Sequence, residues 1–558
     1  MPTCCATRGG VDMRKNKTFS GLKYALLVYL AVTVLLPIIV LFSKIRGDSI
    51  TGVFKSAQFF PMLKNSLITT IIATIISVVL AFALAFALNR SNVRLKAMWV
   101  ILFSIPMLLP SISHGTGVVL LFGDNGLITN LLGWNIHVYG YTGIIMGSVL
   151  YSFPVAFLLF YDSFQYEDYT IYESSSVLGF SKWRQFAKIT LPSMKGTIVS
   201  ACISVFTMVF TDYGVALITG GMQMTLPVYM YREVIGLMDF SSGAVVGIVL
   251  LAPAVVAFLL DLRKSNTGVS ASTVTKKYQV EKNKTRDILL YVGFSLAVFL
   301  LCLPIVAFAC QGFVKQYPIN KTFSFTHLRT LISGGLKMPL IVSIAVALLT
   351  SLFGTILSYF AAYITSRSGR HISNKAMHFI SLLSLAIPGV VLGLSFVLTF
   401  KDVPIYSTIF ILVIVNIVHF FSSPYLLAYN SLSKFNPNLE DVAATLGISK
   451  MRLLISVYVP STMLTIVEMY AYYFVNAMIT ISAVSFLVNF RTTTLSLMIP
   501  QLESQSFMEG TAIVSLLILA INLLVKGLAF LVKLYITKQE AKMRAKHEIL
   551  LVGEEDVK

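Results

Sequence analysis

Residues 172–192 read YESSSVLGFSKWRQFAKITLP, and residues 440–460 read EDVAATLGISKMRLLISVYVP. The two stretches align without a gap at an offset of 268 residues, from Tyr172 to Glu440. The alignment pairs Gly179 with Gly447 and Pro192 with Pro460. The leucine before each glycine, a Ser-Lys dipeptide and an arginine are also identical in the two stretches. A short charged segment that occurs twice in register indicates a larger internal repeat.

The composition of the chain indicates that its solvent is a lipid bilayer. Of its 558 residues, 56% are hydrophobic and 12% are charged. A soluble domain usually carries about 25% charged residues, so this chain lacks the polar side chains that a water-exposed surface needs. The formal net charge of +19 could indicate a nucleic-acid partner, but the positions of the basic residues argue against one.

Twelve stretches are apolar enough to cross a membrane, which takes about 20 residues of helix. Several contain proline or glycine, which membrane helices tolerate when neighbouring groups satisfy the freed backbone. The sequence therefore predicts an all-α integral membrane protein of about twelve transmembrane helices. The stretches are 24–42, 67–88, 97–121, 141–161, 196–218, 242–260, 288–310, 339–363, 377–400, 406–428, 462–488 and 510–532.

The lysines and arginines predict the orientation of these helices. With the N-terminus in the cytoplasm, most of the 43 basic residues fall in tails and loops on the inner side, and the outer loop 123–140 has none. This bias is the positive-inside rule, and basic residues at the inner surface also contact anionic lipid headgroups. The net charge is thereby explained without nucleic acid, and both termini are predicted to be cytoplasmic. The first apolar run has no small-residue cleavage site after it, so it is read as a retained anchor.

A polar segment near the middle predicts the domain organisation. It divides the chain into two halves of six spans, and an even number of spans gives both halves the same orientation, related by an axis along the membrane normal. We therefore expect two parallel six-helix repeats. The predicted segments are a cytoplasmic tail (1–23), a first transmembrane domain (24–260), a cytoplasmic linker (261–287), a second transmembrane domain (288–535) and a second tail (536–558).

The repeated segment reads as a short helix, a glycine turn, a second amphipathic helix and an entry into the bilayer at the proline. Gly179 and Gly447 permit a left-handed turn, and small residues before them allow a partner to approach closely. One alternative is an amphipathic loop that lies on the inner membrane face. Two copies in register, each between the fourth and fifth span of its half, favour a specific partner instead.

This segment resembles the EAA loop of type I ATP-binding cassette (ABC) importer permeases, which has an acid, two small residues, a glycine six positions after the acid, and Leu-Pro. The acids here are Glu173 and Asp441. The first copy has Ser-Ser in place of Ala-Ala, and the second has Val-Ala and ends in Val-Pro. The resemblance implies that the following residues couple the chain to an ATPase: Glu173, Ser174, Ser175, Gly179, Pro192, Asp441, Val442, Ala443, Gly447 and Pro460.

The resemblance also implies the partners. In that family the loop docks into a groove on a cytoplasmic ATPase, so two loops imply two ATPase copies, together with an extracytoplasmic substrate-binding protein in a bacterial inner membrane. The sequence contains no GxxxxGK[ST] phosphate loop. We therefore expect no enzyme activity and no cofactor in this chain, with ATP and magnesium held by the partner ATPase, and no metal site.

Two other classes of protein are alternatives. A twelve-span secondary transporter would need no matched loop, and it usually carries several ionisable residues within its spans, whereas few occur here: His114, Asp212, His419 and Glu468. A membrane enzyme is disfavoured because no Ser/His/Asp or metal-ligand motif is present. The five cysteines form no CxxC motif.

Polar residues at membrane depth are the candidates for the substrate pathway, which we expect along the third and fifth spans of each half. For His114 a structural hydrogen bond is the better explanation. Asp212 is explained equally well by a position near the outer end of its span, facing the binding protein. The stretches FTDYGVALITGG (210–221), AIPGVVLGLSF (386–396) and TISAVSFLV (480–488) resemble permeases for 2-aminoethylphosphonate, with ferric iron as the alternative. The pathway candidates are Ser111, His114, Asp212, Tyr213, Thr480 and Ser482.

Overall fold

The structure, a computed structural model, describes residues 19–133, 136–265, 278–317, 319–368 and 371–555. These residues are almost entirely helical, with one antiparallel pair of strands, β1 (Val314–Gln316) and β2 (Asn320–Phe323). The predicted all-α fold is thus confirmed.

The first half of the chain, through residue 265, begins with a helix from Phe19. Its elements are η1 (Ala31–Leu35), α2 (Leu36–Ser43), α3 (Gly47–Lys55), α4 (Phe59–Asn89), α5 (Lys96–Ser104), η2 (Ile105–Leu108), α6 (Ser111–Phe122), α7 (Leu127–Leu132), α8 (Tyr141–Gln165), α9 (Tyr169–Val177), α10 (Lys182–Gln185), η3 (Phe186–Thr190), α11 (Leu191–Phe210), α12 (Gly214–Thr219), α13 (Leu226–Leu237) and α14 (Phe240–Ser265).

The second half follows the linker. Besides the two strands, its elements are α15 (Lys284–Gly312), α16 (Thr326–Ser333), α17 (Lys337–Arg367), α18 (Ile372–Leu383), η4 (Ser384–Ala386), α19 (Gly389–Phe400), α20 (Ile409–His419), α21 (Ser422–Leu432), α22 (Leu439–Thr445), α23 (Lys450–Leu453), η5 (Leu454–Tyr458), α24 (Val459–Ser461), α25 (Met463–Ile479), α26 (Leu495–Ser504) and α27 (Met508–Glu555).

Not every predicted span is a single straight helix. Within the described residues, 7 helices are long and apolar enough to cross a membrane, or up to 11 if each bent pair counts as one span, and Phe240–Val256 is a shorter apolar helix. The third span of each half is broken most sharply, by 94° and 114°. The breaks fall at Pro110 and Pro388, which directly precede α6 and α19, because proline lacks the N–H that would continue the helix.

The first helix of each half packs on the other half. Phe19 lies edge-on to Phe360 and Tyr363 of α17, at ring-centroid distances of 5.9 and 6.1 Å. Conversely, Phe294 of α15 packs edge-on to Phe103 of α5 at 5.9 Å. The two predicted transmembrane domains are therefore segments of sequence that exchange their first helices, because each of these helices buries its apolar stripe against the opposite half.

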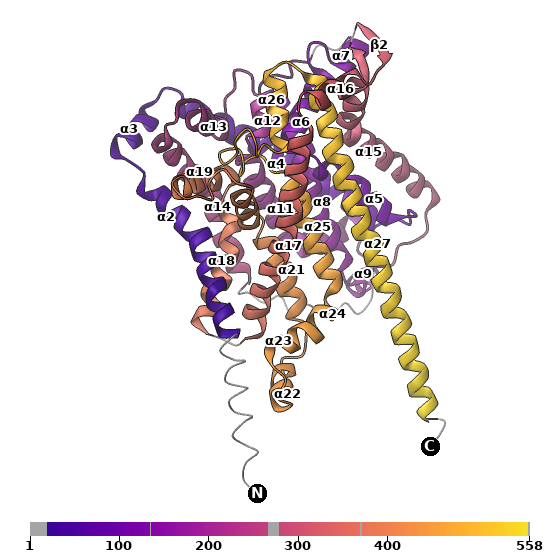
Figure 1. Cartoon of the computed structure of the whole chain (residues 1–558). Helices are drawn as coiled ribbons and strands as arrows, with labels where there is room; N and C mark the ends of the chain where they lie inside the picture. The colour runs from indigo at the N-terminus through magenta and orange to yellow at the C-terminus, as the bar shows by residue number, and fades with distance from the viewer. Residues whose placement is uncertain (1–18, 134–135, 266–277, 318, 369–370, 556–558) are drawn as a thin grey trace.

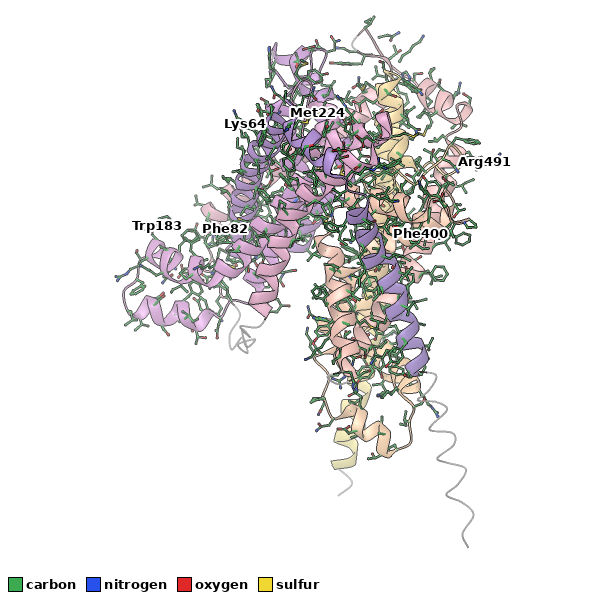
Figure 2. All side chains as sticks on the ribbon, turned by 90° about the vertical axis from the view of Figure 1, so that its left-hand side faces the viewer. Lys64, Phe82, Trp183, Met224, Phe400 and Arg491 are labelled. Carbon is green, nitrogen blue, oxygen red and sulfur yellow. The ribbon has the colours of Figure 1, made fainter. Side chains whose placement is uncertain are left out.

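The repeated segments lie on one face of the molecule. Figure 1 shows α9 and α22–α24 at the same end as the beginning of the first helix and the end of α27, whereas α7, α16, α26 and β2 lie at the opposite end. In Figure 2 the molecule divides into two lobes toward the face that carries the repeated segments, and Trp183 marks the tip of one lobe. This arrangement places both repeated segments where one partner assembly could contact them together.

Candidate functional site: coupling segments and a central cavity

The helix–glycine–helix arrangement occurs twice, as predicted. We call residues 169–192 the first coupling segment and residues 439–460 the second. In each, a serine caps the second helix: Ser181 Oγ accepts a hydrogen bond from Arg184 N (3.3 Å), and Ser449 Oγ accepts one from Arg452 N (3.4 Å). Each segment continues through a π-helical turn, η3 or η5, toward a long membrane helix.

The repeated glycine in the two segments reflects backbone conformation. Gly179 and Gly447 have φ values of +75° and +65°, and no atom lies within 4 Å of a Cβ added at either position. A left-handed residue costs an L-amino acid about 1–2 kcal/mol. Glycine is therefore favoured at both positions by the conformation of the turn and not by crowding.

The coupling segments present apolar side chains to the outside. Val177 and Leu178 are 88% and 73% exposed, and Val442 and Leu446 are 55% and 69% exposed. Of the predicted coupling residues, Ser174, Gly179, Pro192, Asp441, Val442, Gly447 and Pro460 are exposed, Glu173 is half-buried, and Ser175 and Ala443 are buried. Each small-residue pair thus contributes one residue that packs the segment inward and one that faces outward.

A buried arginine anchors the first coupling segment. Arg90, directly after α4, forms an ion pair with Glu167 and stacks on Tyr172, whose ring centroid is 4.5 Å from the guanidinium carbon. The Tyr172 hydroxyl lies 3.1 Å from Glu167 Oε1 and 2.9 Å from Thr190 Oγ1. Burial raises the pKa of the Glu167 carboxyl and raises the pKa of Tyr172 to about 12. We call this set the first arginine cluster.

A second buried arginine anchors the second coupling segment. Arg367, the last residue of α17, donates from Nε and Nη2 to the Glu440 carboxylate at 2.7 and 2.6 Å, and from Nε to the Tyr458 hydroxyl at 3.1 Å. It also donates to the backbone carbonyls of Phe435 (3.0 Å) and Asn436 (2.6 Å). In this second arginine cluster, the Glu440–Tyr458 pair occupies the repeat positions of Tyr172 and Thr190.

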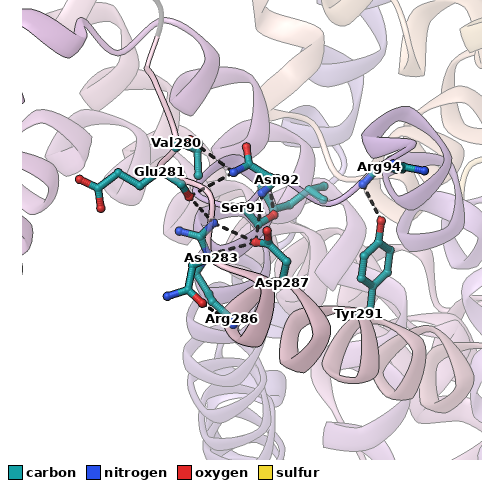
Figure 3. A network of polar contacts seen from close by, with 10 residues as sticks. Ser91, Asn92, Arg94, Val280, Glu281, Asn283, Arg286, Asp287 and Tyr291 are labelled. Carbon is teal, nitrogen blue, oxygen red and sulfur yellow. Dashed lines mark hydrogen bonds and ion pairs between the residues drawn. The ribbon is translucent and has the colours of Figure 1, made fainter.

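The linker contributes to the first cluster. The Tyr278 ring covers the Arg90 guanidinium at 3.2 Å and contacts Tyr169 and Tyr172 at centroid distances of 5.0 and 5.1 Å. Figure 3 shows the adjoining network, in which the Asn92 amide donates to the carbonyls of Val280 (3.3 Å) and Glu281 (3.1 Å). This end of the predicted linker is therefore folded onto the first coupling segment, and residues 266–277 lie outside the described part.

A cavity of about 330 Å³ lies between the halves, beside a smaller one of about 80 Å³. Four residues line both: Tyr151, Asp212, His419 and Ser482. The smaller cavity is also lined by Ser111, Tyr213 and Thr480. Five of the six predicted pathway residues are thus brought together.

His114 is the exception among the predicted pathway residues. It is buried in α6, its Nε2 lies 3.0 Å from the Pro106 carbonyl oxygen, and it lines neither of these cavities. Its position fits the alternative explanation, a structural hydrogen bond.

The Asp212 carboxylate is held by its surroundings. It accepts a hydrogen bond from Val215 N at 2.9 Å, and further bonds from the Ser111 hydroxyl and Gly214 N. A Cβ at Gly214 would lie only 2.4 Å from Ser111 Oγ. The carboxylate therefore caps the short helix α12.

His419 stands out in the sequence only as an ionisable residue, yet it lines both cavities. Its Nδ1 is buried without a hydrogen-bond partner in the described structure. Gly389 leaves room for it, since a Cβ there would lie 3.1 Å from the imidazole and 2.2 Å from Ser482 Oγ. In the first half Ser111 follows Pro110, whereas in the second half Gly389 follows Pro388. This difference between the repeats is a sequence signal that could have pointed to the space beside His419.

Comparison with known proteins gives the family. The family described as "Binding-protein-dependent transport system inner membrane component" matches residues 77–262 and 354–534. The chain belongs to this family and carries its domain twice, which confirms the fused two-domain prediction and places the chain among transport components rather than enzymes.

Individual relatives carry several transport names. The chain is 24% identical over 411 residues to the ferric transport system permease protein FbpB of Actinobacillus pleuropneumoniae, which covers 69% of this chain and 59% of the relative. It is 25% identical over 228 residues to the thiamine transport system permease protein ThiP of Brucella suis, covering 38% and 40%. A solved bacterial alginate ABC transporter matches 46% of the chain with a TM-score of 0.37 and 18% identity. The chain thus spans about three fifths of the length of its ferric relative.

Proposed function

We propose that this chain is the membrane-spanning permease subunit of an ABC importer and that it forms the translocation pathway by alternating access. The single observation that carries the proposal is the pair of coupling segments, each bearing exposed apolar side chains and each tied to a long membrane helix by a buried arginine. Two cytoplasmic ATPase copies would dock there and supply ATP and magnesium. A substrate-binding protein would dock on the opposite face, and both termini would be cytoplasmic.

The cavity between the halves fits a pathway. Polar groups are costly against lipid, and here hydroxyls, an imidazole and a carboxylate gather between the repeats instead. Closure of the ATPases would bring the two coupling segments together and move the halves about this cavity.

Two substrates are candidates, ferric iron and 2-aminoethylphosphonate. The name of the FbpB relative favours ferric iron, and neither the FbpB nor the ThiP name refers to a phosphonate. The cavity residues favour a small zwitterion such as 2-aminoethylphosphonate, because hydroxyl and imidazole groups can donate to a phosphonate. Within the described residues no three or more His, Cys, Asp or Glu side chains gather to hold a metal ion, so ferric iron would pass without such a cluster.

Reconstitution in liposomes tests the proposal. The chain is incorporated with and without its cognate ATPase and binding protein, and uptake of labelled ferric iron and of 2-aminoethylphosphonate is measured. When all components are present, we expect ATP-dependent uptake of one of the two substrates. When any component is missing, we expect no uptake. Uptake by the purified chain alone, driven by an ion gradient, would instead indicate a secondary transporter.

Thiol labelling tests the pathway. Ser482→Cys and Thr207→Cys, which both line the larger cavity, are made in a background without the five native cysteines. A membrane-impermeant reagent should label them differently in ATP-free and ATP-trapped states. Equal labelling in the two states would show that these positions do not line an alternating pathway.

A further inference from the structure

An apolar groove of about 640 Å³ lies on the flank of the second half, separate from the central cavities. Its walls come from the first helix (Leu22, Tyr29), from α17 (Ile356) and from the second coupling segment (Met451, Ile455). Leu22, Ile356 and Ile455 are 42%, 56% and 60% exposed. In a membrane protein, such a surface between helices faces lipid acyl chains.

Two lysines lie next to residues that line this groove, and one of them, Lys23, is 9% exposed. Lys23 follows Leu22 in sequence and Lys450 precedes Met451, and both of these neighbours line the groove. The Lys450 ammonium lies 5.5 Å from the centroid of the Phe19 ring, and Phe19 lies one helical turn before Lys23, on the same face of the first helix. Neither takes part in an ion pair with another described residue.

The combination indicates a ligand that has an anionic head and an apolar body. Two like charges held near each other are stabilised by an anion between them, and the adjoining groove offers almost only apolar atoms. We propose that the groove binds one anionic phospholipid, with its acyl chains along α17 and the first helix and its phosphate between Lys23 and Lys450. Basic residues near the membrane surface attract anionic headgroups in this way.

The first half shows why the site belongs to the second half alone. Lys182 occupies the repeat position of Lys450, but its ammonium lies 3.7 Å from Glu281 Oε1 of the linker. The linker therefore supplies an acidic partner for Lys182 at the first coupling segment. At the second coupling segment, an anion that binds Lys450 would be supplied by another molecule. A lipid bound there would connect the first helix to α23 and steady the second coupling segment.

Native mass spectrometry of the full chain tests the proposal with phosphatidylglycerol and phosphatidylcholine of identical acyl chains. We expect one saturable phosphatidylglycerol site and a preference over phosphatidylcholine that falls about fivefold for each lysine replaced, since a basic residue near the surface contributes about 1 kcal/mol. Lys23→Gln with Lys450→Gln should remove the preference, and Lys182→Gln, the matched control, should retain it. A preference that survives the double substitution, or that Lys182→Gln lowers equally, would overturn the proposal.

A second variant separates a defined site from general attraction to a charged surface. Ile356→Trp places a large side chain in the groove, and it should lower the occupancy of both lipids while the unfolding temperature in phosphatidylcholine stays unchanged. If phosphatidylglycerol binds without saturation and Ile356→Trp has no effect, the lysines attract lipid without a groove site, and the proposal is wrong. A dimer mass that disappears in Ile356→Trp would show that a second copy occupies the groove instead.

Discussion

The two arginine clusters anchor equivalent segments with different chemistry. In the first half, the Arg90 guanidinium packs against the rings of Tyr172 and Tyr278, beside one carboxylate, and its Nη1 has no hydrogen-bond partner in the described structure. In the second half, Arg367 donates to a carboxylate and a hydroxyl of the second coupling segment and to two backbone carbonyls just before that segment. The first cluster therefore depends on the linker, and the second is complete within its own half.

This comparison shows how a fused permease can lose symmetry while it keeps the repeat. The described end of the linker lies beside the first coupling segment, and its Tyr278 takes part in anchoring that segment. Opposite-charge pairs and cation–π contacts can both hold an arginine, so the two halves hold an arginine at the end of the corresponding helix with different partners.

The largest difference in stability between the two halves is expected when the arginines are replaced. Arg367→Ala leaves the carbonyls of Phe435 and Asn436 without their donor and leaves the Glu440 carboxylate with the Tyr458 hydroxyl as a donor but without its ion-pair partner. Breaking a buried ion pair costs about 3–5 kcal/mol. Arg90→Ala should cost less, because Tyr172 and Ser193 still lie 3.1 Å from Glu167 Oε1 and can donate to it. Thermal unfolding and ATP-driven uptake measure both effects, and a larger loss in Arg90→Ala would contradict the comparison.

The glycine turns should respond equally in both halves. Gly179→Val and Gly447→Val each force a β-branched residue to positive φ, at a cost of about 1–2 kcal/mol or more, and each should uncouple ATP hydrolysis from uptake. Gly→Asn is the matched control, because asparagine visits this conformation more readily. Wild-type uptake in Gly447→Val would show that the second segment is not a coupling element.

Removal of the linker ring should affect one half only. Tyr278→Ala removes a contact worth about 1 kcal/mol and should increase hydrogen exchange in residues 169–178 while 439–446 stay unchanged. Tyr278→Phe keeps the ring and should behave like the wild type. Equal changes in both segments would mean that the linker does not anchor the first segment selectively.

The smallest effect is expected from the exposed ion pair between Lys182 and Glu281. Their side chains are 76% and 78% exposed, and such pairs contribute about 0–1 kcal/mol. Glu281→Gln should therefore leave the unfolding temperature nearly unchanged at high salt. A marked loss of stability there would give the linker a larger electrostatic role than its geometry supports.

Local patterns in the sequence were sufficient to predict the helices, the repeat and the left-handed glycines. Apolar length determines where a helix can lie in lipid, and a glycine turn depends on the φ of one residue, so both can be read from a few neighbouring positions. The offset of 268 residues also brings Tyr172–Thr190 and Glu440–Tyr458 into register, and this pair could have been found from the sequence alone.

Contacts between distant segments were decided only by the tertiary structure. The exchange of the first helices, the position of His419 beside Gly389 and the docking of Tyr278 on Arg90 each join residues far apart in the chain. Glu167 and Glu440, which bind the two arginines, do not even occupy matching repeat positions. The sequence by itself determined which segments are helical and repeated, because those properties are local, whereas the partners of each buried polar group depended on which surfaces the packed helices brought together.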